Sequence, residues 1–117
     1  MTIKRYAVAS FLKNHKRLIS ENNFHLVARP KNLQGLATLG LTIKQCPGVI
    51  NSLTIQNYSS GPIPNEDYPG WVMVFGKEIG QQDIYLKLSN TDKSGIKSQA
   101  VCISIHKAEH PLNFPFR

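Results

Sequence analysis

The stretch CISIHKAEHP, residues 102–111, contains two histidines four positions apart, His106 and His110. A zinc-binding pair at this spacing needs a helix, which brings both side chains within reach of one ion. The residues before His106 are instead rich in β-branched side chains, and Pro111 directly after His110 opposes a helix. Along an extended strand, four residues span roughly 13 Å, too far for one ion. With no third His or Cys at a supporting spacing, the sequence predicts no metal site and no cofactor.

His106 ends the last of three segments that are typical of β-strands, WVMVFGK (71–77), DIYLKLS (83–89) and QAVCISIH (99–106). Short glycine-containing turns connect these segments. The sequence therefore predicts two successive hairpins and an antiparallel meander, with His106 close to the end of its final strand.

Side chains alternate across a strand, which divides each of the three segments into two faces. We expect the apolar face to pack against helices through Val72, Val74, Ile84, Leu86, Leu88, Val101, Ile103 and Ile105. The opposite face then carries Trp71, Met73, Phe75, Lys77, Asp83, Tyr85, Lys87, Ala100, Cys102, Ser104 and His106. This second face is the candidate functional face. An ordinary, partly hydrated antiparallel face also carries tyrosine and lysine, and that alternative stays open.

The chain before the meander holds the elements that would cover the apolar face. Apolar spacing predicts a helix over residues 3–21, a strand within 23–29 and a helix over 30–40. Thr42 and Gln45 form a capping-box pattern ahead of another helix, which is either distorted at Pro47 or begins there. Three prolines and two glycines predict no regular structure through the linker 57–70. The expected fold class is α+β, one domain over residues 1–117 with N-terminal helices packed on one face of a small antiparallel sheet.

Charge is distributed unevenly along the 117 residues, whose formal net charge is +7. Residues 1–44 hold eight lysines and arginines against one acid, Glu21, whereas residues 45–117 hold equal numbers of bases and acids. A basic half beside a neutral half indicates a polyanion or an acidic protein as partner. A basic helix that serves only solubility is the alternative.

The two cysteines, Cys46 and Cys102, lie far apart in the sequence and belong to no CxxC pair, which argues against a disulfide framework or a thiolate zinc site. The early apolar run YAVASFL is short and ends in KNHKR, so neither a secretory signal nor a membrane span is expected. We expect a reduced, cytoplasmic protein without a membrane partner.

The order of helix, strand, two helices and meander, together with four local sequence matches, resembles the MqsR family of bacterial toxins. The matches are LGLT (39–42), VINSL (49–53), the Trp71 strand and IYLKL (84–88), and the likeness extends from about Asn22 to Leu88. These toxins are RelE-like endoribonucleases of type II toxin–antitoxin modules. The resemblance implies a RelE-like fold, cleavage of mRNA without a metal, and a cognate antitoxin as protein partner.

The resemblance also assigns residues. The family's active-site tyrosine corresponds to Tyr85, and its C-terminal-strand lysine falls about where this chain has His106. Two further family groups, a lysine and a glutamine, are replaced here by Ser60 and Val72. The tail KAEHPLNFPFR (107–117) has no counterpart in the type member. These departures leave the detailed mechanism and the base specificity open.

Cleavage of RNA without a metal requires a base for the 2′-hydroxyl proton, an acid for the leaving 5′-oxygen and cations for the charged phosphorane. An imidazole such as that of His106 can serve as acid or base near neutral pH. Lys77 and Lys87 can stabilise the developing charge. Tyr85 can donate a hydrogen bond to the scissile phosphate or stack on a base.

Four further residues are candidates for binding RNA. Trp71 and Phe75 can stack on bases, and Arg29 and Lys31 can attract phosphates. The same cations could equally dock an acidic antitoxin. Two other readings remain: a non-catalytic RNA-binding module that uses the same face, and a small interaction domain whose basic helix binds an acidic protein.

Overall fold

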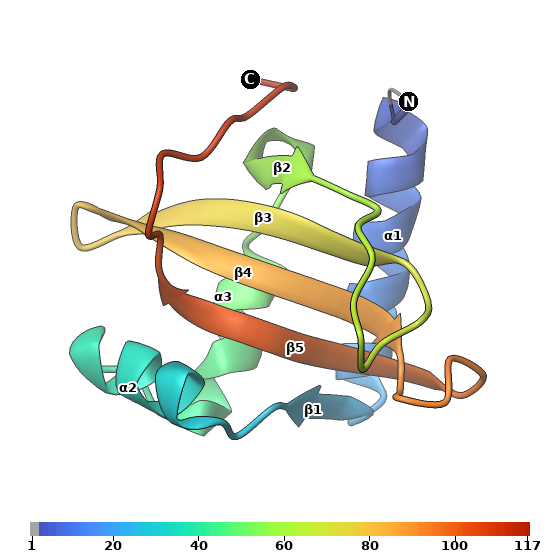
Figure 1. Cartoon of the computed structure of the whole chain (residues 1–117), viewed down its shortest axis with the longest axis horizontal. Helices are drawn as coiled ribbons and strands as arrows, with labels where there is room; N and C mark the ends of the chain where they lie inside the picture. The colour runs from blue at the N-terminus through green and yellow to red at the C-terminus, as the bar shows by residue number, and fades with distance from the viewer. Residues whose placement is uncertain (1–2) are drawn as a thin grey trace.

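The structure, a computed structural model of the chain, describes residues 3–117 and is an α+β fold. Within these residues, three α-helices accompany one five-stranded sheet with the strand order β1-β5-β4-β3-β2 (Figure 1). The helices are α1 (Arg5–Ser20), α2 (Pro30–Thr38) and α3 (Cys46–Asn51), and two short 3₁₀ turns, η1 (Ile43–Gln45) and η2 (Ile55–Asn57), flank α3. The strands are β1 (Phe24–Leu26), β2 (Tyr58–Ser60), β3 (Val72–Ile79), β4 (Gln82–Thr91) and β5 (Ser98–Lys107).

The predicted meander is confirmed, because β3 pairs with β4 and β4 with β5 in antiparallel fashion. The expectation of a wholly antiparallel sheet is wrong. β1 runs parallel to β5, whose outer backbone groups would otherwise lack partners along this edge. The linker also contains a strand that was not predicted, since Tyr58–Ser60 pairs with β3 before the proline-rich part begins.

The helices begin and end where local chemistry predicts. Pro30 occupies the first turn of α2, and Gly40, at a φ of +69°, lies just beyond the helix end. The Thr42 amide donates to Gln45 Oε1 at 2.8 Å, as the capping pattern requires. The expected helix is divided there into η1 and α3. Pro47 thus lies in the first turn of α3, where no amide hydrogen bond is needed.

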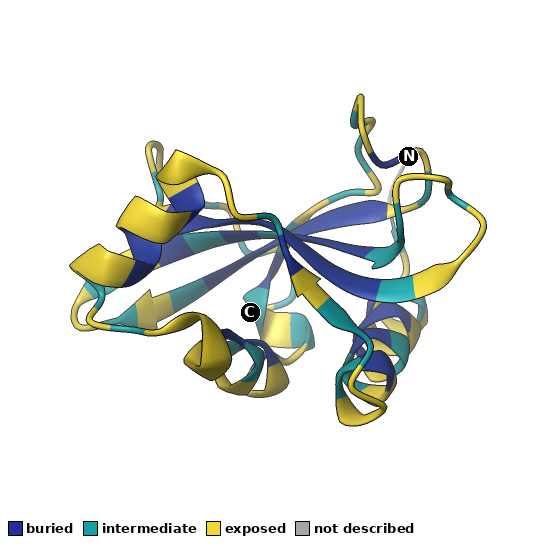
Figure 2. Cartoon of the chain, turned by 90° about the horizontal axis from the view of Figure 1, so that it is seen from below, coloured by how far each residue is buried: buried dark blue, intermediate teal, exposed yellow. Residues whose placement is uncertain are grey.

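The sheet has two differently covered faces. α1 and α3 lie against one face, while the segment that joins β2 to β3 crosses the other, as Figure 1 and the view from below in Figure 2 show. α2 lies along the β5 side of the sheet. The expectation of helices on one face therefore holds for α1 and α3. None of the helices in residues 3–117 has the length and apolar character to cross a membrane.

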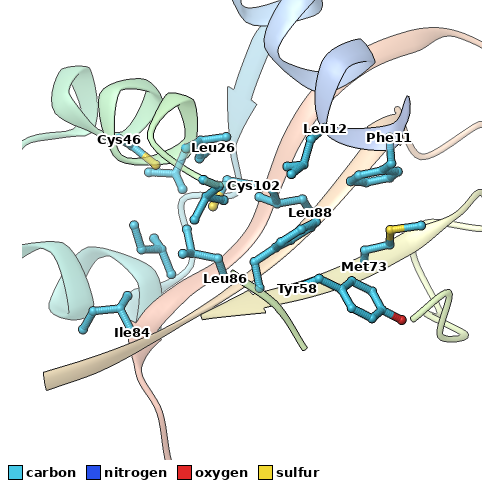
Figure 3. Close-up of a cluster of buried hydrophobic side chains, with 14 of the residues drawn as sticks. Phe11, Leu12, Leu26, Cys46, Tyr58, Met73, Ile84, Leu86, Leu88 and Cys102 are labelled. Atoms are coloured by element: carbon cyan, nitrogen blue, oxygen red, sulfur yellow. The ribbon is translucent and has the colours of Figure 1, made fainter. Parts of the chain in front are cut away.

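The main core lies between the sheet and α1 and α3, and Figure 3 shows part of it. Phe75 is fully buried there and stacks on Phe11 at a centroid distance of 6.1 Å. Met73 is buried in the same cluster. The two thiols, Cys46 and Cys102, are also buried in this core and form no disulfide.

A buried asparagine joins α2 to the sheet where β1 has ended. Asn32 Nδ2 donates to the carbonyl oxygens of Val27 and Ile103, at 2.8 and 2.9 Å. Asn32 Oδ1 accepts from the Ile105 amide at 3.0 Å. The side chain therefore replaces a neighbouring strand along β5. It fixes the N-terminal turn of α2, which carries Lys31, beside the end of β5.

Candidate functional site

The site begins with two rings on neighbouring strands. Tyr85 of β4 and His106 of β5 are cross-strand partners, and their rings stack at a centroid distance of 5.2 Å and an angle of 17°. Ile84, Leu86 and Leu88 point to the opposite side, into the main core. The prediction that Tyr85 and His106 lie on the same face of the sheet is confirmed.

Three cations gather around the ring pair. Lys87 follows Tyr85 on the same face, with its Nζ 6.0 Å from the tyrosine ring centre. Arg29 donates from its guanidinium to the hydroxyl of Ser104, the cross-strand partner of Lys87. Lys31 contributes the third charge from α2. These groups line a cleft of about 300 Å³, which we call the ring cleft; its lining is Arg29, Lys31, Tyr85, Lys87, Ser104, His106, Glu109, His110, Pro111 and Leu112.

The hydrogen bonding of His106 defines which ring nitrogen can act as a base. Nδ1 lies 2.9 Å from the carbonyl oxygen of Lys107, which can only accept, so Nδ1 carries the proton. In the neutral ring, Nε2 then holds the free lone pair. Within residues 3–117, Nε2 makes no hydrogen bond. The imidazole is thus oriented with its basic nitrogen unused.

The environment of the cleft changes the acidity of two side chains. Burial lowers the pKa of Lys87 below its ordinary value, and repulsion from Arg29 and Lys31 lowers it further. Burial also raises the pKa of Tyr85, with Arg29 opposing this effect. Lys87 is therefore a readier proton donor than an exposed lysine, while Tyr85 keeps its hydroxyl proton at neutral pH.

Met73 and Cys102, predicted for this face, lie in the main core instead, and three predicted site residues also lie elsewhere. Lys77 is the cross-strand partner of Ile84, whose side chain is in the main core, so Lys77 is on the helix-covered face. Phe75 is fully buried in that core and is unavailable to a base. Trp71 is exposed, but it lies beside α1. The assignment of alternate residues of β3 to the two faces was wrong because both faces of this strand are covered and its sequence does not alternate.

The C-terminal tail supplies one wall of the ring cleft, which sequence reasoning did not foresee. Glu109 forms an ion pair with Lys31, and this contact joins the tail to α2. Leu112 and Phe114 pack over Gly76, the cross-strand partner of Tyr85. A Cβ at Gly76 would lie 2.8 Å from Phe114 Cζ, so a larger residue here would require the side chains of the tail to shift. No pattern in residues 107–117 marks Glu109 as part of a site.

The sheet face that carries the ring cleft is apolar in its other half, which the linker covers. Tyr68, Val72, Val101 and Ile103 form a second buried cluster under the linker. Val72 is fully buried in it. Ser60 is exposed on the short edge strand β2. Neither residue lines the ring cleft.

His106 and His110 both line the ring cleft, although they are four residues apart. The described residues contain no group of three or more His, Cys, Asp or Glu side chains that could hold a metal ion. The polar groups that line the cleft are two imidazoles, a phenol, a hydroxyl, a carboxylate and three cations.

Comparisons of the chain with protein-family models, with curated proteins and with solved structures find no match. The fold and the site together describe a small α+β protein with a cationic cleft around a stacked tyrosine–histidine pair.

Proposed function

We propose that the protein is an RNA-cleaving toxin with a RelE-like fold, related to the MqsR family, that works without a metal and is silenced by an antitoxin protein. One observation carries this proposal. The stacked pair of Tyr85 and His106 shares its cleft with three cations, Arg29, Lys31 and Lys87. An imidazole with a free basic nitrogen beside clustered positive charge suits a reaction at a phosphodiester.

In the proposed reaction, His106 Nε2 takes the proton of the ribose 2′-hydroxyl. The 2′-oxygen then forms a bond to the adjacent phosphorus, and the bond from phosphorus to the 5′-oxygen breaks. The products are a 2′,3′-cyclic phosphate and a 5′-hydroxyl. Lys87, whose pKa is lowered by burial and by its cationic neighbours, is the candidate acid that gives a proton to the leaving 5′-oxygen.

The remaining groups of the cleft hold the phosphate. Arg29 and Lys31 stabilise the additional negative charge of the phosphorane. Tyr85 donates its hydroxyl proton in a hydrogen bond to a phosphate oxygen, since its raised pKa keeps it protonated. Its ring also holds the imidazole of His106 in place by stacking. Lys77 has no part in this reaction because it lies on the other face of the sheet.

The test is incubation of the purified protein with a mixed-sequence RNA in EDTA. We expect cleavage with cyclic phosphate ends, reduced about 10²- to 10⁴-fold in His106→Ala, the usual contribution of an acid–base group. Tyr85→Phe removes one hydrogen bond and should retain more activity. His25→Ala is the matched control, because His25 is exposed on β1 outside the cleft. Cleavage that survives in His106→Ala would refute the assigned base.

A second candidate function is an RNA-binding module without catalysis. The burial of Val72 favours it, because an apolar cluster occupies the part of the face where the resembling family has a further polar group. RNA that stays intact, both free and loaded on ribosomes, while its binding weakens steeply with salt would support this function instead.

A further inference from the structure

A separate groove lies between α1 and the residue that precedes β3. Its volume is about 680 Å³, and its lining is Tyr6, Ala7, Ser10, Phe11, Lys13, Asn14, Arg17 and Trp71. None of these residues lines the ring cleft. Tyr6 and Trp71 are 76% and 53% exposed, unusually high for aromatic side chains of a folded domain. We call this feature the α1 groove.

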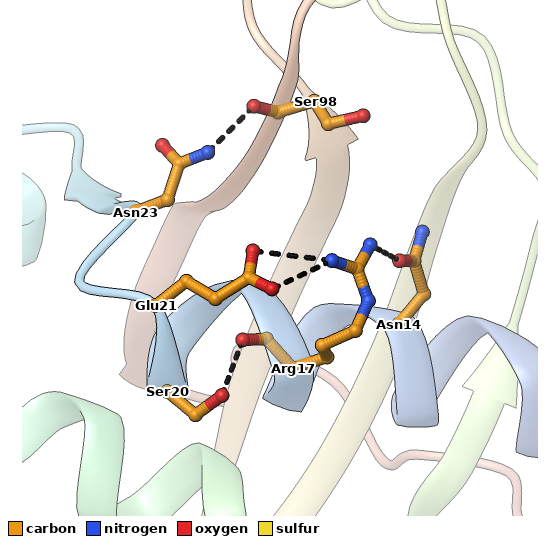
Figure 4. A network of polar contacts seen from close by, with 6 residues as sticks. All are labelled: Asn14, Arg17, Ser20, Glu21, Asn23 and Ser98. Carbon is orange, nitrogen blue, oxygen red and sulfur yellow. Dashed lines mark hydrogen bonds and ion pairs between the residues drawn. The ribbon is translucent and has the colours of Figure 1, made fainter.

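The α1 groove is cationic as well as aromatic. Lys13 is exposed and forms no ion pair within residues 3–117. Arg17 is held in position by Asn14, at 2.6 Å, and by Glu21, at 3.0 Å (Figure 4). Because Glu21 is the only acid in residues 1–44, the positive charge of α1 is largely uncompensated.

We infer that the α1 groove binds single-stranded RNA, with bases stacked on Tyr6 and Trp71 and phosphates beside Lys13 and Arg17. A cationic groove with exposed aromatic rings is the general means of binding single strands without sequence preference. The inference rests on RNA as the ligand class of the proposed function. It adds a second site, on the helix-covered side of the sheet, that holds RNA without cleaving it.

A protein partner fits the α1 groove less well. A stable protein interface buries about 800 Å² on each side around an apolar centre that is poor in lysine. Here the large exposed apolar side chains are two rings, Tyr6 and Trp71, and the groove that they line also carries Lys13 and Arg17. Two rings beside cations suit bases and phosphates better than a packed protein surface.

Trp71 provides a direct test because it is the only tryptophan in the chain. The probe is a short 2′-O-methyl oligouridine, which cannot be cleaved through its 2′-oxygen. We expect it to quench Trp71 fluorescence, with an affinity that falls as salt is raised. Tyr6→Ala should weaken binding by about 5- to 150-fold, the usual contribution of one stacked base. Lys13→Gln should also weaken it, whereas Lys93→Gln, an exposed lysine in the β4–β5 turn, is the matched control.

Three results would overturn the inference: no quenching by the oligonucleotide, equal affinity in Tyr6→Ala and wild type, or quenching that is lost in Lys87→Gln of the ring cleft. Quenching by polyglutamate but not by the oligonucleotide would assign the groove to an acidic protein instead. The cleavage assay gives an independent result. Quenching of Trp71 fluorescence without any cleavage of RNA would refute the proposed enzyme but not RNA binding in the α1 groove. Cleavage of RNA without quenching would refute only RNA binding in the α1 groove.

Discussion

His15 should make the stability of the fold depend on pH. Its side chain is fully buried on α1, and Nδ1 lies 2.7 Å from Asn90 Oδ1. Asn90 Nδ2 donates to the Phe11 carbonyl oxygen, so Oδ1 accepts and His15 Nδ1 carries a proton. Among residues 3–117, Nε2 is buried without a hydrogen-bond partner. A second proton on this nitrogen would therefore place an unpaired charge in the core.

Burial is the largest cause of the change in His15, and it lowers the pKa from 6.5 to about 4 against the opposing effect of the Asn90 hydrogen bond. The unfolded chain then binds more protons than the folded chain between pH 6.5 and about pH 4. Stability is complete above pH 6.5 and is lost as the pH falls through that window. At pH 5, which is 1.5 pH units below the unfolded value, the loss from this group is about 2 kcal/mol, at about 1.4 kcal/mol for each unit.

The assay is urea unfolding at pH 7.5 and pH 5, for the wild type and for His15→Gln, whose amide can still donate to Asn90. We expect the wild type to lose about 2 kcal/mol more than the variant between the two pH values. His25→Gln, at an exposed position on β1, should leave the difference unchanged. Equal losses in the wild type and His15→Gln would refute the reasoning. So would a His15 pKa near 6.5 measured by NMR in the folded protein.

Two other predictions concern the contacts that place α2 beside the ring cleft. Asn32→Ala leaves two carbonyls and one amide at the β5 edge without their partner, and should cost about 3 kcal/mol in urea unfolding; a loss below about 1 kcal/mol would mean that water replaces the side chain. Glu109→Gln breaks the ion pair with Lys31 and frees that cation. It should raise the affinity of the ring cleft for a fluorescent 2′-O-methyl RNA by roughly two- to fivefold at low salt, measured by anisotropy in a Tyr6→Ala background. Glu78→Gln, an exposed acid on β3, controls for net charge, and an equal gain in that variant would contradict the local effect.

The two faces of β4 were predicted correctly from the sequence, because one face of this strand is partly exposed to water. β4 alternates clearly, because Tyr85 and Lys87 are partly exposed while Ile84 and Leu86 are buried. In β3 both faces are covered from Val72 to Phe75, so apolar residues occur at each of these positions and alternation carries no information. The side of the sheet on which Phe75 lies could not be predicted for that reason.

The two faces of β5 were predicted correctly only in part of the strand, because its pairing with β4 is irregular. Lys87 pairs with Ser104 and Leu88 with Cys102, so Ile103 is an extra residue in the ladder. The extra residue reverses the alternation, and Cys102 enters the main core while Val101 and Ile103 join the second cluster. A continuous apolar run contains no signal for such a bulge.

The positions of the ring pair depend on two consecutive strands, whereas the positions of the cations Arg29 and Lys31 depend on a contact between distant parts of the chain. Tyr85 and His106 meet in the regular part of the β4–β5 ladder, between the pairs Ile84–Lys107 and Lys87–Ser104. A sequence pattern can show that the two strands are consecutive and which face each ring occupies, but not the register, because the extra residue Ile103 separates this pair from the connecting turn. Arg29 and Lys31 reach the same place only because the buried Asn32 attaches α2 to β5, some seventy residues away in the sequence. The basic charge of residues 1–44 therefore predicts an anionic ligand. The sequence does not show which of these charges lie together: one buried amide places Arg29 and Lys31 at the ring cleft, while Lys13 and Arg17 lie beside the exposed Trp71 along α1.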